Sequence, residues 1–286
     1  MDVLSDAVTA LRTGRPVATT MAWRAPWGQR FATVPGAVGI QVVVRGDCWL
    51  LPEDGPPLHL DTGDVVLLTD GRGHALADDP ATPLRPCANA VEREPQDDGP
   101  VRVLCAAYEL NGLRTHPLLR AVPDRVHLAG GPTLRTVIEL LDAELATEHS
   151  PAGIGVTALL DLLFLHTLRA WSERDGEPGA LADPAVRAAL DAIHADPGHP
   201  WTVAALAARG GLSRAPFAKR FAALTGRPPL SYLTWWRLTL AARLLRESDA
   251  PLRAVARRVG YGSEFAFAAA FKRHFGTAPG FFRRGT

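Results

Sequence analysis

One histidine and two cysteines in the first half of the chain are residue types that bind soft metal ions or react with oxidants. His74 follows the apolar run 65–68 after a short turn, Cys87 lies in the proline-rich segment 83–87, and Cys105 ends the expected strand 101–105. Imidazole and thiolate groups are ligands of zinc, and thiolates are also the targets of oxidants. The spacing is irregular and lacks a Cys-x-x-Cys pair, so a zinc site, an oxidation switch and simple packing are three interpretations of these residues.

A second set of candidate residues lies in the last third of the chain, where the sequence repeats itself with an offset of 50 residues. Each copy predicts a short helix, a turn containing glycine and a second helix that begins at a serine. A turn glycine supplies the positive φ of a sharp bend, and a serine satisfies unpaired backbone N–H groups at the start of a helix. The matched pairs are Gly210 and Gly260, Ser213 and Ser263, Phe217 and Phe267, Phe221 and Phe271, Gly226 and Gly276, and Pro229 and Pro279.

The second helix of each copy has an apolar face and an opposite face that can meet DNA. Its two phenylalanines are four residues apart, so they share one face and are expected in the core. We expect helix-turn-helix units at about 202–224 and 252–275, joined by a rigid helix over 230–247. Such a connection would hold two helices at a spacing that suits successive major grooves. In the first copy the outward residues are Arg214, Ala215, Ala218 and Lys219, with Arg220 beside them.

The charged residues divide unequally along the chain. Residues 183–286 contain 16 lysines and arginines and 6 acidic residues, whereas residues 1–182 contain 15 and 24. The net charge of +1 therefore combines a balance of +10 with a balance of −9. A strongly basic part attracts a polyanion such as DNA. Two solvated surfaces that differ in charge are the alternative explanation.

The segment 260–283, from Gly260-Tyr261-Gly262-Ser263 to Phe281-Phe282-Arg283, resembles the C-terminal signature of AraC-type regulators. The first copy and the connecting helix are similar to the same family, so the resemblance covers about residues 183–286. It implies a sequence-specific transcriptional regulator whose partner is promoter or operator DNA, with RNA polymerase as a further contact. The residues do not distinguish an activator from a repressor.

The resemblance also implies which side chains meet bases. It points to Ala215, Ala218 and Lys219 in the first unit and to the equivalent Glu264, Phe265 and Ala269 in the second. Ala269 stands where many family members have a basic or polar residue, so we expect the first unit to read most of the bases. The second unit would mainly hold the DNA backbone through Lys272 and Arg273. The candidate DNA contacts are Ser213, Arg214, Ala215, Ala218, Lys219, Arg220, Ser263, Glu264, Phe265, Lys272 and Arg273.

The N-terminal half predicts short strands separated by frequent turns, typical of a small antiparallel barrel or sandwich. Its segment from Gly63 to His74 resembles the second sequence motif of cupins, with Thr69 in place of the usual proline. The half as a whole resembles the cupin-type sensor that precedes an AraC-type domain in many bacterial regulators. That resemblance implies a pocket for a small-molecule or redox effector.

In a cupin barrel, His74 is expected to end a strand that faces the pocket. The alternation in 101–105 predicts that Cys105 shares a face with Val101 and Val103, and the connection that carries Cys87 is expected to fold over the mouth of the pocket. We interpret Cys48, beside a tryptophan on an expected strand, as a core residue.

Two enzyme classes compete with a regulator. A cupin-fold metal-dependent enzyme fused to a DNA-binding module would need the histidines of the first cupin motif, but the corresponding strand Ile40–Gly46 contains none. A DNA-repair alkyl acceptor would need a compact, cysteine-rich zinc cluster, which this chain of three cysteines lacks. We therefore expect no catalytic residues, with zinc as the one cofactor considered.

Two helices are predicted between the barrel and the DNA-binding part. The first starts near Pro132, and the second carries an apolar face from Val156 to Leu168. These faces either cover the barrel or form the seam of a homodimer. The expected fold is α+β with two domains: a cupin-like barrel with the helical pair over 1–175, a linker over 176–183, and an all-α double helix-turn-helix domain over 184–286.

The remaining features favour the cytoplasm and give no sign of a membrane. The N-terminus lacks the basic region of a secretory signal, and the longest apolar run, 158–168, is interrupted by Asp161 and His166. An odd number of cysteines does not form a disulfide framework, which suits a reducing compartment.

Overall fold

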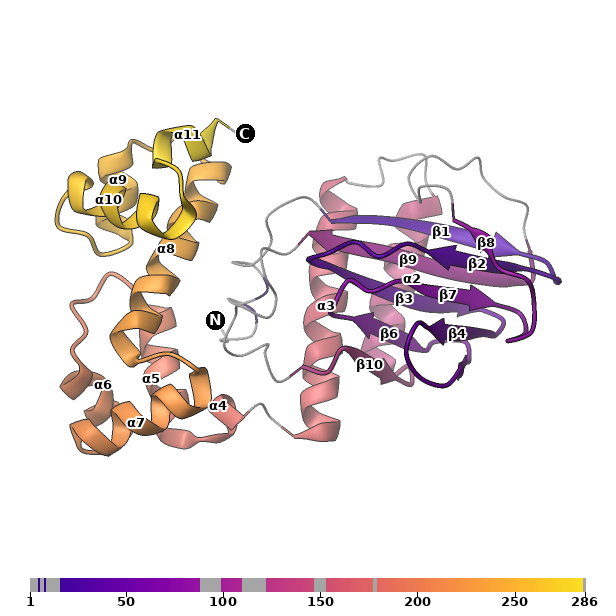
Figure 1. Ribbon diagram of the computed structural model, residues 1–286, viewed down its shortest axis with the longest axis horizontal. Coiled ribbons are helices and arrows are strands. Elements are labelled where there is room, and N and C mark those ends of the chain that lie inside the picture. The colour runs from indigo at the N-terminus through magenta and orange to yellow at the C-terminus, as the bar shows by residue number, and fades with distance from the viewer. Residues whose placement is uncertain are drawn as a thin grey trace. The chain divides into compact units, whose positions relative to one another are not determined.

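The computed structural model describes Ser5, Val8 and residues 16–87, 99–109, 122–146, 153–176 and 179–284. The chain divides into two compact units, one ending at Gly176 and the other made mainly of residues 177–286. The first contains the strands and two long helices, and the second is entirely helical in its described residues (Figure 1). This confirms the expected α+β fold with a helical C-terminal part.

Within the described residues, the first unit consists of two five-stranded sheets. Their strand orders are β1-β9-β3-β6-β10 and β5-β4-β7-β2-β8. The strands pair antiparallel except β8, which lies parallel to β2. The strands are β1 (Val17–Trp23), β2 (Gly28–Phe31), β3 (Ala37–Arg45), β4 (Cys48–Pro52), β5 (Leu58–Leu60), β6 (Val65–Leu68), β7 (His74–Ala77), β8 (Arg85–Pro86), β9 (Val101–Glu109) and β10 (Arg125–Leu128).

The first sheet is buried on both faces, which explains why β3 carries apolar residues on both sides, with Gln41 as its one buried polar side chain. Val43 belongs to the core that packs between the two sheets, together with Leu50 and Leu76 of the second sheet. Its neighbour Val42 points to the opposite face and is equally buried. Contacts of α2 and α3 with β1, β3 and β10 cover that face. Strands covered on both faces favour continuous hydrophobic residues over alternation.

The helical pair consists of α2 (Pro132–Ala146) and α3 (Ile154–Asp175). Its apolar faces are buried inside the barrel unit. Val137 and Leu141 of α2 are buried, as are Leu160 and Phe164 of α3. The covering role is therefore correct, and a dimer seam on these same faces is wrong because the sheet and the partner helix already occupy them. Among the described residues α3 alone is long and apolar enough to cross a membrane. Its buried side chains mark it instead as a core helix.

The C-terminal unit contains two helix-turn-helix pairs on either side of a long helix. The helix α8 (Pro229–Glu247) contacts α7 of the first pair and α9, α10 and α11 of the second. The helices α4 and α5 pack on the first pair. The bounds are α4 (Gly179–Ala182), α5 (Pro184–Ala195), α6 (Val203–Arg209), α7 (Arg214–Thr225), α9 (Leu252–Arg258), α10 (Glu264–Phe275) and α11 (Pro279–Arg283).

The structure differs from the sequence-based expectation in the connection between the units. The helix α3 continues to Asp175. It ends at Gly176, whose φ of 93° favours glycine. The helix α4 lies within the expected linker 176–183 because Ala180 and Leu181 are buried against α5 and α7. Tertiary burial therefore outweighs the local glycine and proline signals.

Candidate nucleic-acid interface and barrel pocket

The two phenylalanines of each repeated helix orient α7 and α10. Phe217 and Phe221 of α7 are fully buried, as are Phe267 and Phe271 of α10. The side of each helix that lies away from these rings faces solvent. The core positions predicted from the four-residue spacing are therefore confirmed.

The helix α7 presents basic groups in its N-terminal half. Arg214, Ala215 and Lys219 are exposed, and Ala218 is half-buried between them. Arg220 differs, because its Nε forms an ion pair with Asp183, the residue that caps α5. Asp183 is largely buried and also accepts hydrogen bonds from Ala185 N and Val186 N. The structure therefore gives Arg220 a partner within the protein, on the side of α7 that faces α5.

The helix α10 presents a different surface. Its first turn exposes Glu264 and Phe265, and Phe265 is 89% exposed. One turn later Ala269 is exposed, and the basic residues Lys272 and Arg273 lie in the last turn. Positive charge is thus in the first half of α7 and at the end of α10, although the helices are repeats of each other.

The serine caps and turn glycines also differ between the copies. Ser263 Oγ accepts a hydrogen bond from Ala266 N at 3.1 Å, whereas Ser213 makes no such bond. The positive φ belongs to Gly211 in the first turn and to Gly260 in the second. Gly210, the sequence match of Gly260, has a φ of −93° and is instead needed for room, since a Cβ there would lie 2.7 Å from Ala185. The predicted cap is therefore present in the second unit and missing in the first.

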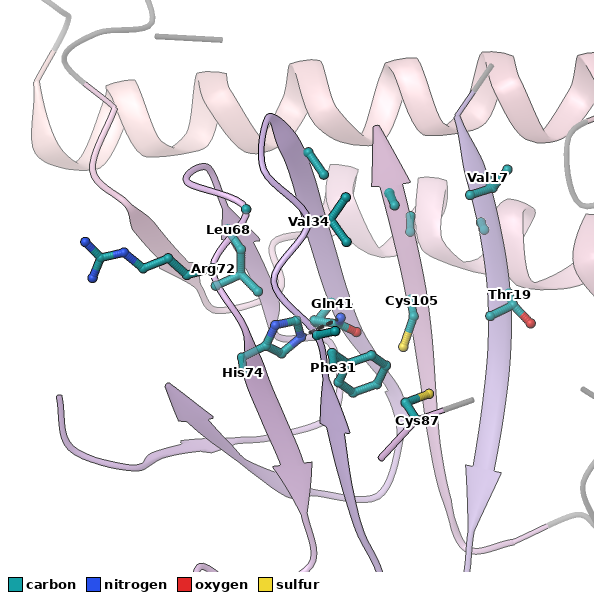
Figure 2. A pocket seen from close by; sticks show the side chains of 17 residues that line it. Val17, Thr19, Phe31, Val34, Gln41, Leu68, Arg72, His74, Cys87 and Cys105 are labelled. Atoms are coloured by element: carbon teal, nitrogen blue, oxygen red, sulfur yellow. Dashed lines mark hydrogen bonds between the residues drawn. The ribbon is translucent and has the colours of Figure 1, made fainter. Parts of the chain in front are cut away.

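The barrel unit contains a cavity of about 240 Å³ between its two sheets. Figure 2 shows Gln41 and His74 meeting across it, with Phe31 beside them and the sulfur atoms of Cys87 and Cys105 nearby. Most of the other lining groups are apolar, from Val17, Ala18, Ala32, Val34, Ala37, Leu68, Ala106 and Ala107. The cavity therefore suits an apolar molecule with one polar end.

The polar end consists of a glutamine and a histidine from opposite sheets. Gln41 Nε2 lies 3.0 Å from His74 Nε2, and the imidazole stacks on Phe31 with 4.8 Å between ring centroids. Burial lowers the pKa of His74 to about 4, against smaller opposing effects of the Arg72 backbone and Asp70. The imidazole is therefore neutral at pH 7 and accepts from the amide. Gln41 Oε1 is buried with no hydrogen-bond partner among the described residues, so it offers an acceptor to a bound molecule.

The three cysteines are thiols in different surroundings. Cys105 shares the inner face of β9 with Val101 and Val103, as the alternation predicted, and Cys87 follows β8 and packs against the same core. Cys87 is therefore anchored at a sheet edge, where its N–H donates to the Arg30 carbonyl at 2.7 Å, and is not on a loop folded over the mouth. Cys48 is fully buried, and burial raises its pKa to about 12. Its predicted core position is confirmed.

His74, Cys87 and Cys105 line one cavity, but they do not form a set of metal ligands. No group of three or more histidine, cysteine, aspartate or glutamate side chains in the described ranges is arranged to hold a metal ion. His74 starts β7 and does not end a strand, and its Nε2 is turned to the amide of Gln41. A zinc site stays a prediction that would require the three side chains to move together.

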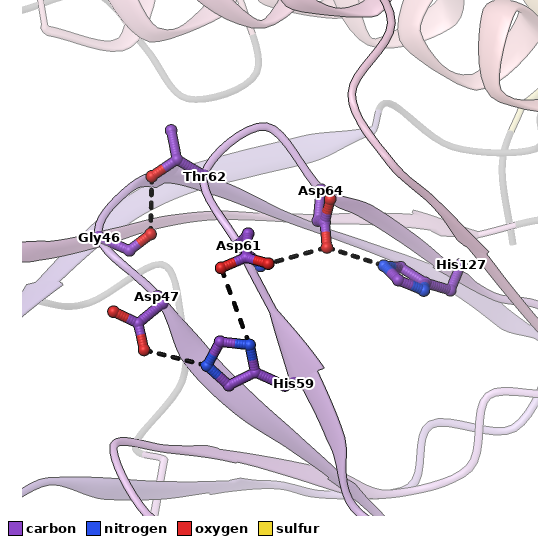
Figure 3. Close-up of polar contacts among 7 residues, drawn as sticks. All are labelled: Gly46, Asp47, His59, Asp61, Thr62, Asp64 and His127. Atoms are coloured by element: carbon purple, nitrogen blue, oxygen red, sulfur yellow. Dashed lines mark hydrogen bonds and ion pairs between the residues drawn. The ribbon is translucent and has the colours of Figure 1, made fainter.

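The structure also brings together polar residues that the sequence analysis missed. His127 Nε2 lies 2.8 Å from Asp64 Oδ2, and His59 lies between Asp47 and Asp61, at 3.1 Å and 3.8 Å (Figure 3). Pairing of β10 with β6 joins His127 to Asp64 across 63 residues of sequence, which no local pattern signals. The Asp64 carboxylate also accepts from Asp61 N at 3.1 Å. These contacts stabilise the turn before β6.

Comparison with known proteins identifies relatives over nearly the whole chain. A family model described as a cupin matches residues 2–173, and one described as a helix-turn-helix domain matches residues 206–285. A putative AraC-like transcription regulator of Streptomyces antibioticus is 37% identical, with 99% of each chain covered. The regulator AlkR of Acinetobacter baylyi is 30% identical, with 85% of this chain and 86% of AlkR covered. The RCS-specific transcriptional activator RclR of Escherichia coli is 28% identical, with 87% of each covered.

Two solved structures were also found to be similar to this chain. The DNA-binding domain of AdpA, in complex with a target DNA, is 36% identical and covers 36% of this chain and 91% of that domain, with a TM-score of 0.34. ToxT from Vibrio cholerae is 12% identical and covers 95% of this chain and 98% of ToxT, with a TM-score of 0.39.

Proposed function

Because this chain belongs to the AraC-like transcription regulators, we propose that α7 and α10 read its operator and that the barrel cavity holds its effector. The protein binds double-stranded DNA and regulates transcription. One observation carries the proposal for the DNA contacts: two repeated helices expose their outer faces on a part of the chain with a charge balance of +10. Arg214 and Lys219 would act in the first unit, and Phe265, Lys272 and Arg273 in the second.

Salt titration of DNA binding tests this proposal. Each phosphate neutralised by a basic side chain releases a counterion, so the logarithm of affinity falls linearly with the logarithm of salt concentration. Fluorescence anisotropy of the full chain on an operator selected from random sequence should show this slope, and a specific site should bind at least about 10³-fold more tightly than random DNA. An affinity that does not depend on salt concentration, or that is equal for the selected site and for random DNA, would contradict the proposal.

For the effector, we propose a small, mainly apolar molecule whose hydrogen-bond donor meets Gln41. Support comes from the apolar lining and the unpartnered Gln41 Oε1. Gly39 borders the cavity, and a Cβ there would make only ordinary contact with Leu68, at 3.7 Å. Gly39→Leu should therefore fill space without disrupting β3. A panel of small neutral compounds should raise the melting temperature of the wild type and not of this variant, with unchanged DNA affinity in their absence.

An oxidant is the alternative effector, acting on Cys87 and Cys105. A disulfide would form as the two thiols lose two protons and two electrons to an oxidant such as hydrogen peroxide, which is reduced to water. Their shared cavity supports this chemistry. Mild peroxide should then remove two titratable thiols and change DNA affinity, and Cys87→Ser should abolish both effects. Unchanged thiol counts and promoter response in Cys87→Ser and Cys105→Ser would assign the two residues to packing.

Zinc is retained as the third proposal for the same residues. It predicts about one zinc per chain in purified protein, lost in Cys105→Ser, and measured by metal analysis. We further propose that the barrel does not catalyse a reaction, since Gln41 occupies the inner face of the strand where a metal-dependent cupin needs histidine. The protein would act in the cytoplasm as a homodimer that also contacts RNA polymerase.

A further inference from the structure

The two helix-turn-helix units meet around one side chain of the connecting helix α8. Arg237 donates from Nε to the carbonyl oxygen of Pro197, 2.6 Å away, and from Nη2 to that of His199, 2.8 Å away. Both carbonyls belong to the loop between α5 and α6, which leads into the first helix-turn-helix unit. Charged donors make the stronger hydrogen bonds in proteins, and the planar guanidinium fixes their directions. Arg237 thus holds the α5–α6 loop against α8.

The same guanidinium lies against the turn of the second unit. A Cβ atom on Gly260 would be 2.7 Å from Arg237 Nη2 and 2.9 Å from Gly198 Cα, so only glycine leaves room for this approach. Gly260 also has a φ of +82°, a conformation that glycine adopts without strain. A Cβ on Gly198 would be 3.5 Å from the Arg258 carbonyl oxygen. Three elements therefore meet at one point: the α5–α6 loop, the helix α8 and the turn of the second helix-turn-helix unit.

The loop that Arg237 holds is ordered by its own contacts. Asp196 Oδ1 accepts from His199 N at 3.0 Å, and the Asp196 carbonyl accepts from Trp201 Nε1 at 2.8 Å. Burial lowers the pKa of Arg237, while Tyr261 and Asp196 favour its charged form. An arginine stays protonated in such surroundings, so the junction persists at every physiological pH.

We propose that Arg237 is a positioning residue that sets the spacing between α7 and α10, and with it the number of base pairs that separates the two halves of the operator. The proposal rests on the proposed DNA contacts of both helices. When two binding units are held rigidly at the correct spacing, the second contact forms within the complex and strengthens binding without new interactions. One inserted base pair displaces the second half-site by about 3.4 Å and rotates it by about 35°. A rigid pair of units cannot follow that change, whereas a loosened pair can.

Binding of the full-length chain to operators of altered spacing tests the proposal. The operator is selected from random sequence with the wild type, and a second version carries one extra base pair between its two protected halves. The insertion should lower wild-type affinity by about 10-fold or more. Arg237→Lys keeps the charge but loses the two-pronged contact. This variant should bind the native operator less tightly and should lose only about 2- to 3-fold on insertion.

Arg243→Lys is the matched control, since Arg243 lies on the same helix and pairs with Glu247 at 3.6 Å. This control should retain the wild-type response to the insertion. An Arg237→Lys protein that melts like the wild type and responds to the insertion as the wild type does would overturn the proposal, and α8 alone would then set the spacing. A wild type without a salt-dependent, specific site would overturn the proposed DNA contacts as well.

Discussion

Individual side chains explain why the two repeated helices should contribute differently to DNA recognition. At equivalent positions α7 carries Ala215 and Lys219, whereas α10 carries Phe265 and Ala269. The two residues of α7 include a charged hydrogen-bond donor, whereas the two residues of α10 offer only apolar surface. Since base edges in the major groove present both polar groups and the thymine methyl, the two helices are suited to different bases.

Lys219→Ala separates a base contact from a phosphate contact. If Lys219 reads a base, its loss should weaken binding to the selected operator by about 1–3 kcal/mol and leave binding to random DNA nearly unchanged. Lys272→Ala is the comparison, because a phosphate contact should weaken both DNAs similarly and lower the salt slope by about 1. Anisotropy titrations on both DNAs give the two numbers. Equal losses for Lys219→Ala on the two DNAs would make Lys219 a backbone contact.

Phe265 is expected to contact a thymine methyl group. Phe265 is 89% exposed on the first turn of α10 and contributes little to the core. Replacing thymine by deoxyuridine, one operator position at a time, removes only the methyl group. At one position the wild type should lose about 0.8 kcal/mol, roughly fourfold in affinity. Phe265→Ala should bind both versions of that position equally. If no such replacement lowers the affinity of the wild type, the contact is excluded.

His74 predicts how the stability of the barrel depends on pH. Its pKa is lowered from 6.5 to about 4 in the folded state by burial, so between these values the unfolded chain binds a proton that the folded chain does not. The free energy of unfolding therefore falls as pH drops from about 6.5 to 4. His74→Gln replaces the imidazole by an amide that can still hydrogen-bond Gln41, and it removes the titration. The free energy of unfolding of the barrel, measured in urea, should depend less on pH in this variant than in the wild type. An identical pH dependence would assign the effect to other groups.

At the level of elements, the two repeated helices start differently, because the first copy has Pro216, which lacks an N–H, where the second has Ala266. Ser263→Ala should destabilise the second helix-turn-helix unit by about 1 kcal/mol, because Ser263 Oγ satisfies the Ala266 N–H. Ser213→Ala is the internal control and should cost much less, since Ser213 makes no side-chain cap. Hydrogen exchange of the amides in α7 and α10 measures the two effects separately. Equal losses of protection would mean that both serines cap their helices in solution.

At the level of the whole molecule, a homodimer has to use surfaces that the fold leaves open. Among the described residues of α2 and α3, the exposed large hydrophobic residues are Leu140, Ile154 and Leu162, with Ile154 91% exposed. We expect dimers through these residues, and Leu162→Glu should shift the full chain toward monomers at tens of micromolar by mass action. Leu230→Glu, an exposed leucine of the other unit, is the control. Sedimentation velocity that shows monomers for every protein would exclude this interface.

The sequence alone determined the features that depend on local spacing. Helix periodicity and glycine turns are properties of neighbouring residues, so the repeat predicted both helix-turn-helix units and the burial of Phe217, Phe221, Phe267 and Phe271. Strand alternation likewise placed Cys105 on the inner face of β9. The resemblance of 260–283 to the AraC signature implied the function, because such a signature is an order of residues along the chain.

Only the tertiary structure decided which distant groups meet. Gln41 and His74 are 33 residues apart and belong to different sheets, so their contact depends on how the two sheets pack. The ion pair of Arg220 with Asp183 and the hold of Arg237 on the α5–α6 loop depend on helix packing in the same way. Hydrogen bonds require partners within about 3 Å, and that distance is set by the packing of the chain around them.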